Sequence, residues 1–583
     1  MKTLHVIFCV SISAAFAVAA EAVDHLTLAD AIPGRTGVCI TEMDGGERVE
    51  IPLTVLGTIG SGTPDGEIVL VRLDDPRFEH TGIIAGMSGS PVYLDGRLLG
   101  ALAFGWPFAK EPIGGVTPFA RMLEIEPSSS AAAAASAADG RPPFGEIVAA
   151  IRAGALGTMV VDWLQPEEAN RLQPLPLVVG GPWVPSGSGW LAESWRRLGW
   201  VGTPGGAAAD GVGEGEITPG DMVAAVLVDG DVSIAAAGTV TEIRGDLLWA
   251  FGHPSLGAGA VVMPLARASV VAVMPSVMSS FKFFTVGEPI GALVADRAPG
   301  VVGRLGQKAP MVPIRVSVDG RAYSFRAVRQ PTLLPLLVGY LSHASQSAFG
   351  RTFGDQTMST KIEVRYPGQE TVMVSAVFTG IQASAEAAAF ATAVVGYFEG
   401  SSFAAPAIES VDISLVTSED LRTANIIEIV PETRVVRPGQ ELEVRFRMQR
   451  HRGGEETRTL TLRIPDGIPD GRLDLVGADG AAWTVYDLQM RPFETSSFAD
   501  EVRLANSLIP GNTLVAVLER QDLGMVVSGG SLSAPPSLVL QLRSALGPNL
   551  ETTAYSVFAK TEIEVPYRVT GAQRIPLTVR SRE

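Results

Sequence analysis

Residues 80–106 read "HTGIIAGMSGSPVYLDGRLLGALAFGW", and this stretch predicts how the surrounding chain folds. Glycine on both sides of Ser88 permits a tight turn that exposes the serine hydroxyl, since glycine adopts backbone conformations closed to other residues. Pro91 ends the turn, an apolar strand follows, and Asp95-Gly96 supplies a two-residue hairpin turn before a second apolar strand returns. The stretch therefore predicts a β-hairpin that begins at an exposed serine.

Such a turn suits nucleophilic chemistry. A serine hydroxyl is a weak nucleophile, so it needs a base within hydrogen-bond reach and donors aimed at the oxyanion that forms on attack. The N–H groups of Gly86, Met87 and Ser88 converge in a turn of this kind, which predicts an oxyanion hole. The edge of the returning strand could pair with an extended peptide. A Gly/Ser turn in an ordinary β-barrel is the alternative interpretation.

The base must be one of a few histidines. His253, in "DLLWAFGHPSLG", stands out because an apolar strand delivers it to a Gly-His-Pro turn, where the imidazole would face a cleft from a rigid support. A buried structural histidine is the alternative. The other histidines outside the N-terminal segment lie in loops, in a helical pattern or in a charged hairpin, and are interpreted as packing or solvated side chains: His25, His80, His343 and His451.

An orienting acid is expected in "EIVLVRLDDPRFEHTG". Asp75 has the same strand parity as Leu73 and so points toward the apolar side, where a carboxylate requires a partner. Asp74 has the opposite parity, although Pro76 could reverse the two. An Asx-turn role for either aspartate is the alternative.

Composition limits the class of protein. The 583-residue chain is 46% hydrophobic and 18% charged, so it can bury several cores and is expected to fold as several domains. Its formal net charge of −17 leaves no basic stripe to follow phosphates, which argues against a nucleic-acid partner. No cluster of His, Cys, Asp or Glu has the spacing of metal ligands, and no cofactor is expected.

The N-terminus resembles an export signal. Residues 1–22, "MKTLHVIFCVSISAAFAVAAEA", combine a basic start, an apolar stretch and small residues at A-x-A spacing. Cleavage would leave a secreted, periplasmic or cell-envelope protein that carries Cys39 alone, without an internal disulfide. No later segment is apolar for long enough to span a membrane.

Strand-length apolar runs and turn signals divide the rest of the chain. Two β regions are separated by "EPSSSAAAAASAADGRPP", a low-complexity linker, and alternating apolar residues after residue 440 indicate a further antiparallel sheet. The expected divisions are a signal peptide (1–22), a first β region (23–126), a linker and connecting region (127–216), a second β region (217–318), an α/β extension (319–405) and a β-sandwich-type accessory region (406–583).

The two β regions resemble one known family. "RLDDPRFEHTGIIAGMSGSPVYLDGRLLGALAFGW", followed by "GGVTPFARML", resembles the nucleophile half of the SpoIVB-like serine peptidases (stage IV sporulation protein B type). "AGTVTEIRGDLLWAFGHP", followed by "FKFFTVGEPIGALVADRAPGVVGRLG", resembles the histidine half. The resemblance implies Ser88 as nucleophile, His253 as base and Asp75 as orienting acid.

Two features depart from that family. The halves occur in permuted order here, so the chain order becomes Asp, Ser, His, which triad geometry permits. No PDZ-type module is found. The implied fold is mainly β, with a trypsin-like double β-barrel in permuted halves and a C-terminal β-sandwich-type accessory domain.

The expected function is therefore that of a secreted or envelope serine endopeptidase, which acts on a protein or peptide substrate. A catalytically inactive envelope binding or scaffold protein on the same fold is the alternative. Self-cleavage at the Ala/Ser linker is a third hypothesis.

Overall fold

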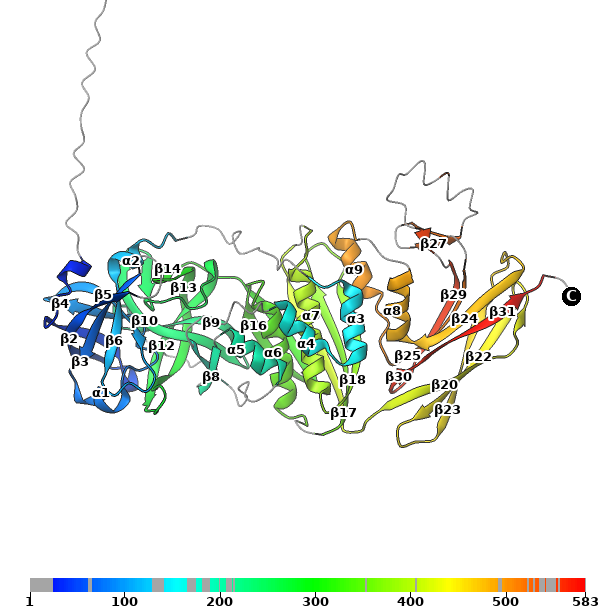
Figure 1. Ribbon diagram of the computed structural model, residues 1–583, viewed down its shortest axis with the longest axis horizontal. Coiled ribbons are helices and arrows are strands. Elements are labelled where there is room, and N and C mark those ends of the chain that lie inside the picture. Colours follow the sequence, from blue (N-terminus) through cyan, green and yellow to red (C-terminus); the bar gives the residue numbers. More distant parts are fainter. Residues whose placement is uncertain are drawn as a thin grey trace, which may run out of the picture.

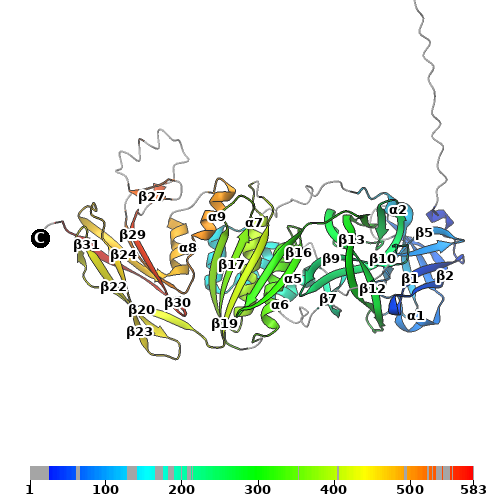
Figure 2. The ribbon, with the colours of Figure 1, turned by 180° about the vertical axis from the view of Figure 1, so that it is seen from behind.

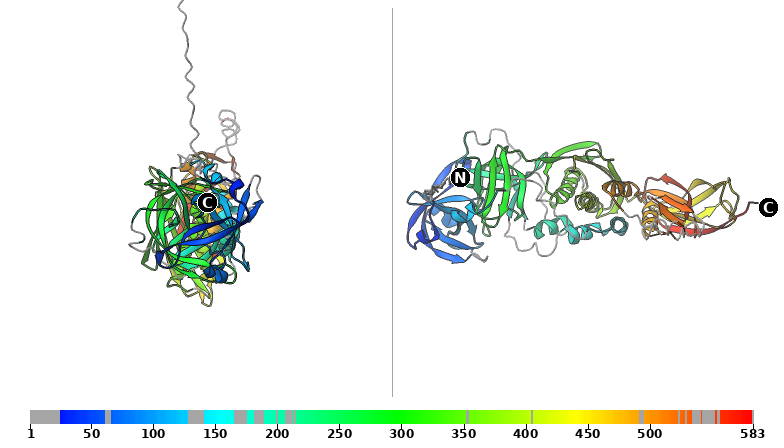
Figure 3. Two further views of the ribbon diagram at one scale, coloured as in Figure 1. Left: turned by 90° about the vertical axis from the view of Figure 1, so that its left-hand side faces the viewer. Right: turned by 90° about the horizontal axis from the view of Figure 1, so that it is seen from above.

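The structure is a computed structural model. It describes residues 25–60, 66–127, 141–164, 175–180, 189–198, 200–205, 212, 215–351, 354–403, 406–490, 495–521, 524–527, 530–533, 541, 552–553 and 556–581. The described parts lie in a row (Figure 1), with the N-terminal strands at one end and the C-terminal sheets at the other. The view from above shows the same elongated arrangement, and the other view looks along the row from its N-terminal end (Figure 3). The predicted signal peptide and residues 128–140 of the predicted Ala/Ser linker lie outside the described residues.

The first barrel is a closed antiparallel ring in the order β1-β2-β3-β6-β5-β4. In β2, Ile51, Leu53 and Val55 alternate with more exposed residues and point into the barrel core, as a half-buried strand requires. Its strands are β1 (Thr36–Glu42), β2 (Arg48–Gly60), β3 (Glu67–Leu73), β4 (Ser90–Leu94), β5 (Arg97–Gly105) and β6 (Ile113–Pro118), with short helices η1 (Leu28–Asp30), η2 (Asp44–Gly46), α1 (Pro76–Thr81) and α2 (Phe119–Leu123).

The second barrel repeats this topology. Its strands form the ring β9-β10-β11-β14-β13-β12, because β9 pairs with both β10 and β12, and all pairings are antiparallel. Counted within each ring, the strand order is the same in both barrels. The strands are β9 (Met222–Gly230), β10 (Ser233–Arg244), β11 (Leu247–Ala250), β12 (Gly259–Met274), β13 (Phe281–Arg297) and β14 (Gly300–Leu305).

An α/β layer continues from the second barrel, because β16 pairs with β9 and extends the sheet through β15, β19, β17 and β18. The sequence predicted that the second β region ends at residue 318. In the structure the ring ends with β14, and β15 belongs to the α/β layer. The layer contains β15 (Met311–Val318), β16 (Arg321–Val328), β17 (Gln356–Arg365), β18 (Val372–Gly380), β19 (Ser410–Ser418), α6 (Leu334–Ser347) and α7 (Ala383–Glu399).

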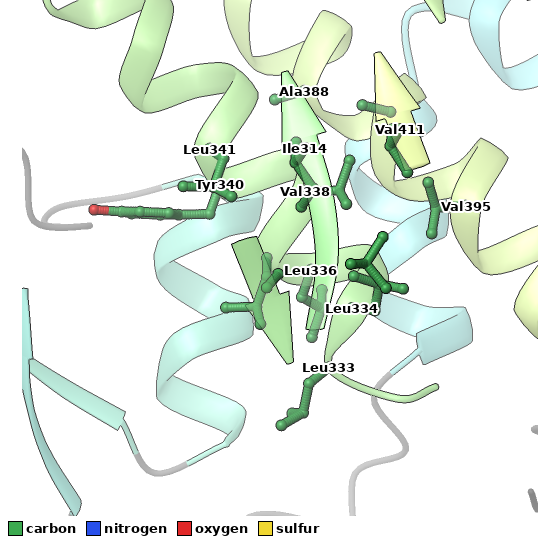
Figure 4. Close-up of a cluster of buried hydrophobic side chains, with 14 of the residues drawn as sticks. Ile314, Leu333, Leu334, Leu336, Val338, Tyr340, Leu341, Ala388, Val395 and Val411 are labelled. Carbon is green, nitrogen blue, oxygen red and sulfur yellow. The ribbon is translucent and has the colours of Figure 1, made fainter. Parts of the chain in front are cut away.

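Helices cover one face of this layer, and the open face of the sheet is seen from behind (Figure 2). Val338 of α6 lies among the side chains of Ile314 from β15 and Val395 from α7 in the largest core of the molecule (Figure 4). The connecting region adds α3 (Phe144–Ala153), α4 (Leu156–Leu164), β7 (Leu175–Gly180), α5 (Trp190–Arg197) and β8 (Trp200–Gly205), with β7 and β8 at the edge of the sheet next to β10.

Two sheets at the C-terminal end share one hydrophobic core. Leu442, Val444, Phe446 and Met448 of β22 are buried on alternate positions, as their sequence pattern predicted. The sheet orders are β23-β22-β20-β30, β21-β31-β24-β25-β29 and a small β27-β26-β28. The elements are β20 (Thr423–Pro431), β21 (Val435–Val436), β22 (Glu441–Arg450), β23 (Glu455–Arg463), β24 (Gly471–Asp479), α8 (Gly480–Met490), α9 (Phe498–Asn506), β25 (Thr513–Arg520), β26 (Gly524–Val527), β27 (Gly530–Ser533), β28 (Thr552–Thr553), β29 (Ser556–Glu564), β30 (Arg568–Thr570) and β31 (Ala572–Val579).

The mainly β class predicted from the sequence is confirmed, as is the presence of a closed β-barrel. Among the described residues, no helix is both long and apolar enough to cross a membrane.

Candidate active site

The turn at residues 84–90 holds Ser88 at the start of β4. Gly86 and Gly89 both have φ of +100°, in the region that favours glycine, which explains the two glycines of the motif. The Gly89 N–H donates to Leu102 O at 2.7 Å and ties the turn to β5. Ser88 is half-buried, so the residue keeps some contact with solvent.

Two of the three predicted oxyanion donors remain available. Neither the Gly86 nor the Ser88 N–H donates to an acceptor within the described part of the chain. The Met87 N–H donates to Ile84 O at 3.0 Å, because the turn closes on itself at this point. Met87 therefore does not belong to the predicted hole, which is reduced to the N–H groups of Gly86 and Ser88.

The turn packs directly against β10 of the second barrel. The Thr239 N–H donates to Ser88 O at 2.7 Å, and the Thr241 hydroxyl donates to Gly89 O at 2.7 Å. A side chain on Gly89 would begin 1.9 Å from Thr239 O and 2.5 Å from Phe251 N, closer than any real contact. Gly89 is thus required by the docking of the barrels as well as by its own φ.

The segment that carries His253 reaches the same interface from the other side. After β11 the chain passes through Phe251 and Gly252, both with φ of +69°, and a bulky residue in this region is a strained conformation. The Thr117 hydroxyl of β6 donates to Gly252 O at 2.6 Å. The segments of Ser88 and His253, far apart in sequence, therefore both lie at the junction of the two barrels.

The His253 ring is half-buried, and its hydrogen bonding defines its tautomer. Nδ1 lies 2.8 Å from Pro254 O, and a carbonyl oxygen only accepts, so the neutral ring carries its proton on Nδ1 and its lone pair on Nε2. Burial lowers the pKa of His253. The Pro254 carbonyl and the Asp296 carboxylate act in the other direction and raise it. No hydrogen bond joins His253 to Ser88 among the described residues; such bonds are often long in an unliganded site.

Asp296 is a site residue that the sequence reasoning missed. It is fully buried at the end of β13 and accepts hydrogen bonds from the N–H groups of Ser255 at 2.8 Å and Leu256 at 2.7 Å. Burial raises the pKa of Asp296, and these backbone donors oppose the rise. Asp296 thus fixes the loop that directly follows His253. The available signal was an aspartate that ends the apolar run "GALVAD", where a buried charge needs donors.

Asp75 occupies a different place from the one the resemblance implied. It is the N-cap of α1, accepting from the Arg77 N–H at 2.9 Å, and it forms an ion pair with the Arg77 guanidinium at 2.7 Å. The Arg77 side chain lowers the pKa of Asp75. Within the described residues neither Asp75 nor Asp74 contacts His253, and Asp74 instead bonds Thr54 and Arg72. The Asx-type alternative describes Asp75, because the chain turns into a helix at Pro76.

A buried lysine lies beneath the turn that holds Ser88. A Cβ atom added at Gly86 would lie 3.1 Å from Cδ of Lys282, which is on β13. The Lys282 ammonium donates a hydrogen bond to Thr41 Oγ1 at 2.8 Å. Its backbone N–H donates to Ala85 O at 3.1 Å. Lys282 is 2% exposed, and burial lowers its pKa to about 8. One side chain of the second barrel thus supports the turn of the first.

Other candidate sites lie elsewhere. A cleft of about 470 Å³ lies between the end of α3, the turn from β18 to α7, and Arg568, and it has no lining residue in common with the site of Ser88 and His253. In the part of the chain that the structure describes, no three His, Cys, Asp or Glu side chains are grouped to hold a metal ion.

Comparison of the chain with protein-family models, with curated proteins and with solved structures finds no match. The resemblance to SpoIVB-like peptidases therefore stays a prediction from the motifs.

Proposed function

We propose that the protein is a serine endopeptidase in which two β-barrels, in permuted order relative to the SpoIVB-like peptidases, form one trypsin-like active site. The observation that carries the proposal is the meeting of two segments at one interface. The Ser88 carbonyl accepts from Thr239 of the second barrel, and the Gly252 carbonyl, next to His253, accepts from Thr117 of the first.

The proposed reaction follows from the described groups. His253 Nε2 takes the proton from the Ser88 hydroxyl as Oγ attacks the carbonyl carbon of the peptide bond. The oxyanion faces the N–H groups of Gly86 and Ser88. The C–N bond then breaks, the imidazolium gives its proton to the leaving amine, and a water molecule hydrolyses the remaining ester with His253 again as base.

In this proposal the Pro254 carbonyl and the Asp296 carboxylate orient His253 and stabilise its charged form, which is the role of the aspartate in a conventional triad. The Pro254 carbonyl holds the Nδ1 proton of His253, which leaves Nε2 as the base. The Asp296 carboxylate favours the imidazolium electrostatically, since it raises the pKa of His253 against the effect of burial. An orienting carbonyl and a nearby buried carboxylate together do what a directly bonded aspartate does in a conventional triad.

The substrate would bind as an extended strand. β4 begins at Ser90, opposite Leu102, whereas β5 continues to Gly105 and pairs on its other side with β6. The backbone of residues 103–105 therefore has no strand partner on the β4 side within the described residues. An extended peptide could add itself there, beside the nucleophile.

A fluorophosphonate probe tests the proposal, because it forms a covalent bond only with an activated serine. We expect the purified protein to be labelled, Ser88→Ala to be unlabelled, and His253→Ala to be slowed by about 10⁶-fold, as for triads that act as a unit. Ser279→Ala, at an exposed site, is the matched control and should keep full labelling. A wild-type protein that is never labelled would contradict the proposal and favour the envelope scaffold.

The setting of the activity is part of the proposal. The residues before position 23 support export to the periplasm, the envelope or the medium. Self-cleavage at the Ala/Ser linker would appear as two stable fragments in the wild type and one intact chain in Ser88→Ala.

A further inference from the structure

Ile83 occupies the space beside the proposed peptide-binding edge. It lies between α1 and the turn that holds Ser88 and is half-buried. A side chain on Gly105 would begin 3.0 Å from Ile83 Cβ, and one on Gly114 would begin 3.1 Å from Ile83 Cδ1. Because Gly105 and Gly114 have no side chains, space is left over the end of β5 and the start of β6. Ile83 fills this space over Gly105, and it shares the space over Gly114 with Leu102, whose Cδ1 would lie 2.6 Å from a side chain there.

This space is where a substrate side chain would enter. A peptide paired along residues 103–105 presents successive side chains to opposite faces. The residue whose carbonyl oxygen lies at the N–H groups of Gly86 and Ser88 must direct its side chain away from the nucleophile. Ile83 lies on the chain just before the turn and against Gly105 of β5 and Gly114 of β6, so it borders the space that such a side chain would enter.

We propose that Ile83 closes the side-chain pocket of the site, so that the substrate carries glycine or alanine immediately before the bond that is cleaved. This inference rests on the proposed endopeptidase function and adds its substrate class. A branched side chain packed against two glycines takes up the space that a Leu or Phe side chain of the substrate would need. A small residue needs no such space, and its backbone still pairs with the edge.

Peptidyl diphenyl phosphonates test the pocket directly. These probes acquire a bond from Ser88 Oγ to phosphorus and lose phenoxide, and a series can differ only in the side chain next to phosphorus. We expect the wild type to react faster with the Gly and Ala probes than with the Leu and Phe probes. Ile83→Ala removes all but the first carbon of the side chain and should raise the Leu-to-Ala ratio of labelling rates by at least about tenfold.

Ile59→Ala is the matched control, since Ile59 lies on β2 of the same barrel and is well exposed. It should leave the ratio unchanged. Labelling of each variant by the non-peptidyl fluorophosphonate shows that its site is folded.

The outcomes separate the two proposals. A wild type that prefers Leu or Phe, or reacts with none of the peptidyl probes while the fluorophosphonate labels Ser88, overturns the pocket. An unchanged ratio in Ile83→Ala overturns it as well. A wild type that the fluorophosphonate does not label overturns the endopeptidase function on which the pocket depends.

Discussion

The two barrels have the same strand order and closure, yet they support the candidate site in different ways. The first barrel forms a turn from local sequence, with two glycines at positive φ and a proline that follows them. The second barrel contributes buried charge, in Lys282 beneath the turn and Asp296 behind His253. Two barrels of the same topology thus contribute to the candidate site in different ways: the first through the shape of its backbone, and the second through buried side chains.

The two contributions depend on each other. Gly89 has no room for a side chain because β10 lies against it, and Lys282 is buried because the first barrel covers it. The interface also buries Glu42 at the end of β1, which accepts from the N–H groups of Met222 and Val270. Breaking either contribution should therefore disturb the docking of the barrels.

The largest effect is expected from Gly89→Ala. The new side chain would meet backbone atoms of Thr239 and Phe251, which cannot rotate away, so we expect a loss of about 4 kcal/mol or more in stability and no fluorophosphonate labelling. Urea unfolding followed by circular dichroism measures the change. Gly96→Ala is the control, since Gly96 has a similar φ of +74° but open space, and should lose only about 1–2 kcal/mol. Equal losses would show that the docking is not as described.

Lys282→Met tests the buried charge of the second barrel. The folded pKa of about 8 lies below the ordinary 10.5, so between these values the unfolded chain binds more protons, and the unfolding free energy of the wild type should rise with pH. The full rise is about 3 kcal/mol, and it is lost again as the pH falls through 8. Urea titrations from pH 7 to 10.5 should show a flatter profile for Lys282→Met. Lys308→Met, at an exposed lysine, should retain the wild-type rise.

Asp296→Asn tests whether the buried carboxylate of the second barrel raises the pKa of His253. Without the carboxylate, the pKa of His253 should fall, and the acid limb of the pH profile for phosphonate labelling should move to lower pH. Asp296→Ala would in addition leave buried N–H groups unpaired and cost about 1–3 kcal/mol. Asp246→Asn, at a largely exposed aspartate, is the control and should leave the acid limb in place. A limb that moves to higher pH would contradict the assigned role.

Asp75→Ala should have the smallest effect. As a helix N-cap paired with Arg77, Asp75 contributes about 1 kcal/mol to stability, and the labelling rate of Ser88 should be nearly unchanged. An orienting acid would instead contribute about 10⁴-fold to the rate. A loss of that size would restore Asp75 to the triad and remove Asp296 from its role.

Sequence reasoning predicted the local parts of the site well. The turn around Ser88, the hairpin after it and the strand that leads to His253 all follow from nearby residues, and the structure contains each of them. Sequence reasoning failed where the position of a side chain or the partner of an N–H group depended on where a strand ends and a helix or turn begins. Asp75 shares the strand parity expected of an inward carboxylate, but the chain had already turned into α1, and Met87 gave its N–H to a carbonyl within the turn.

The sequence by itself determined the mainly β class, the apolar alternation of the strands and the glycine turn, because each depends on neighbours within a few residues. Only the tertiary structure decided that the two barrels dock on Gly89, that Lys282 and Asp296 are desolvated, and that Ile83 lies against the paired glycines of β5 and β6. Burial and close contact join residues as far apart in the sequence as Thr41 and Lys282, and no local pattern encodes which distant backbone will lie against a given glycine.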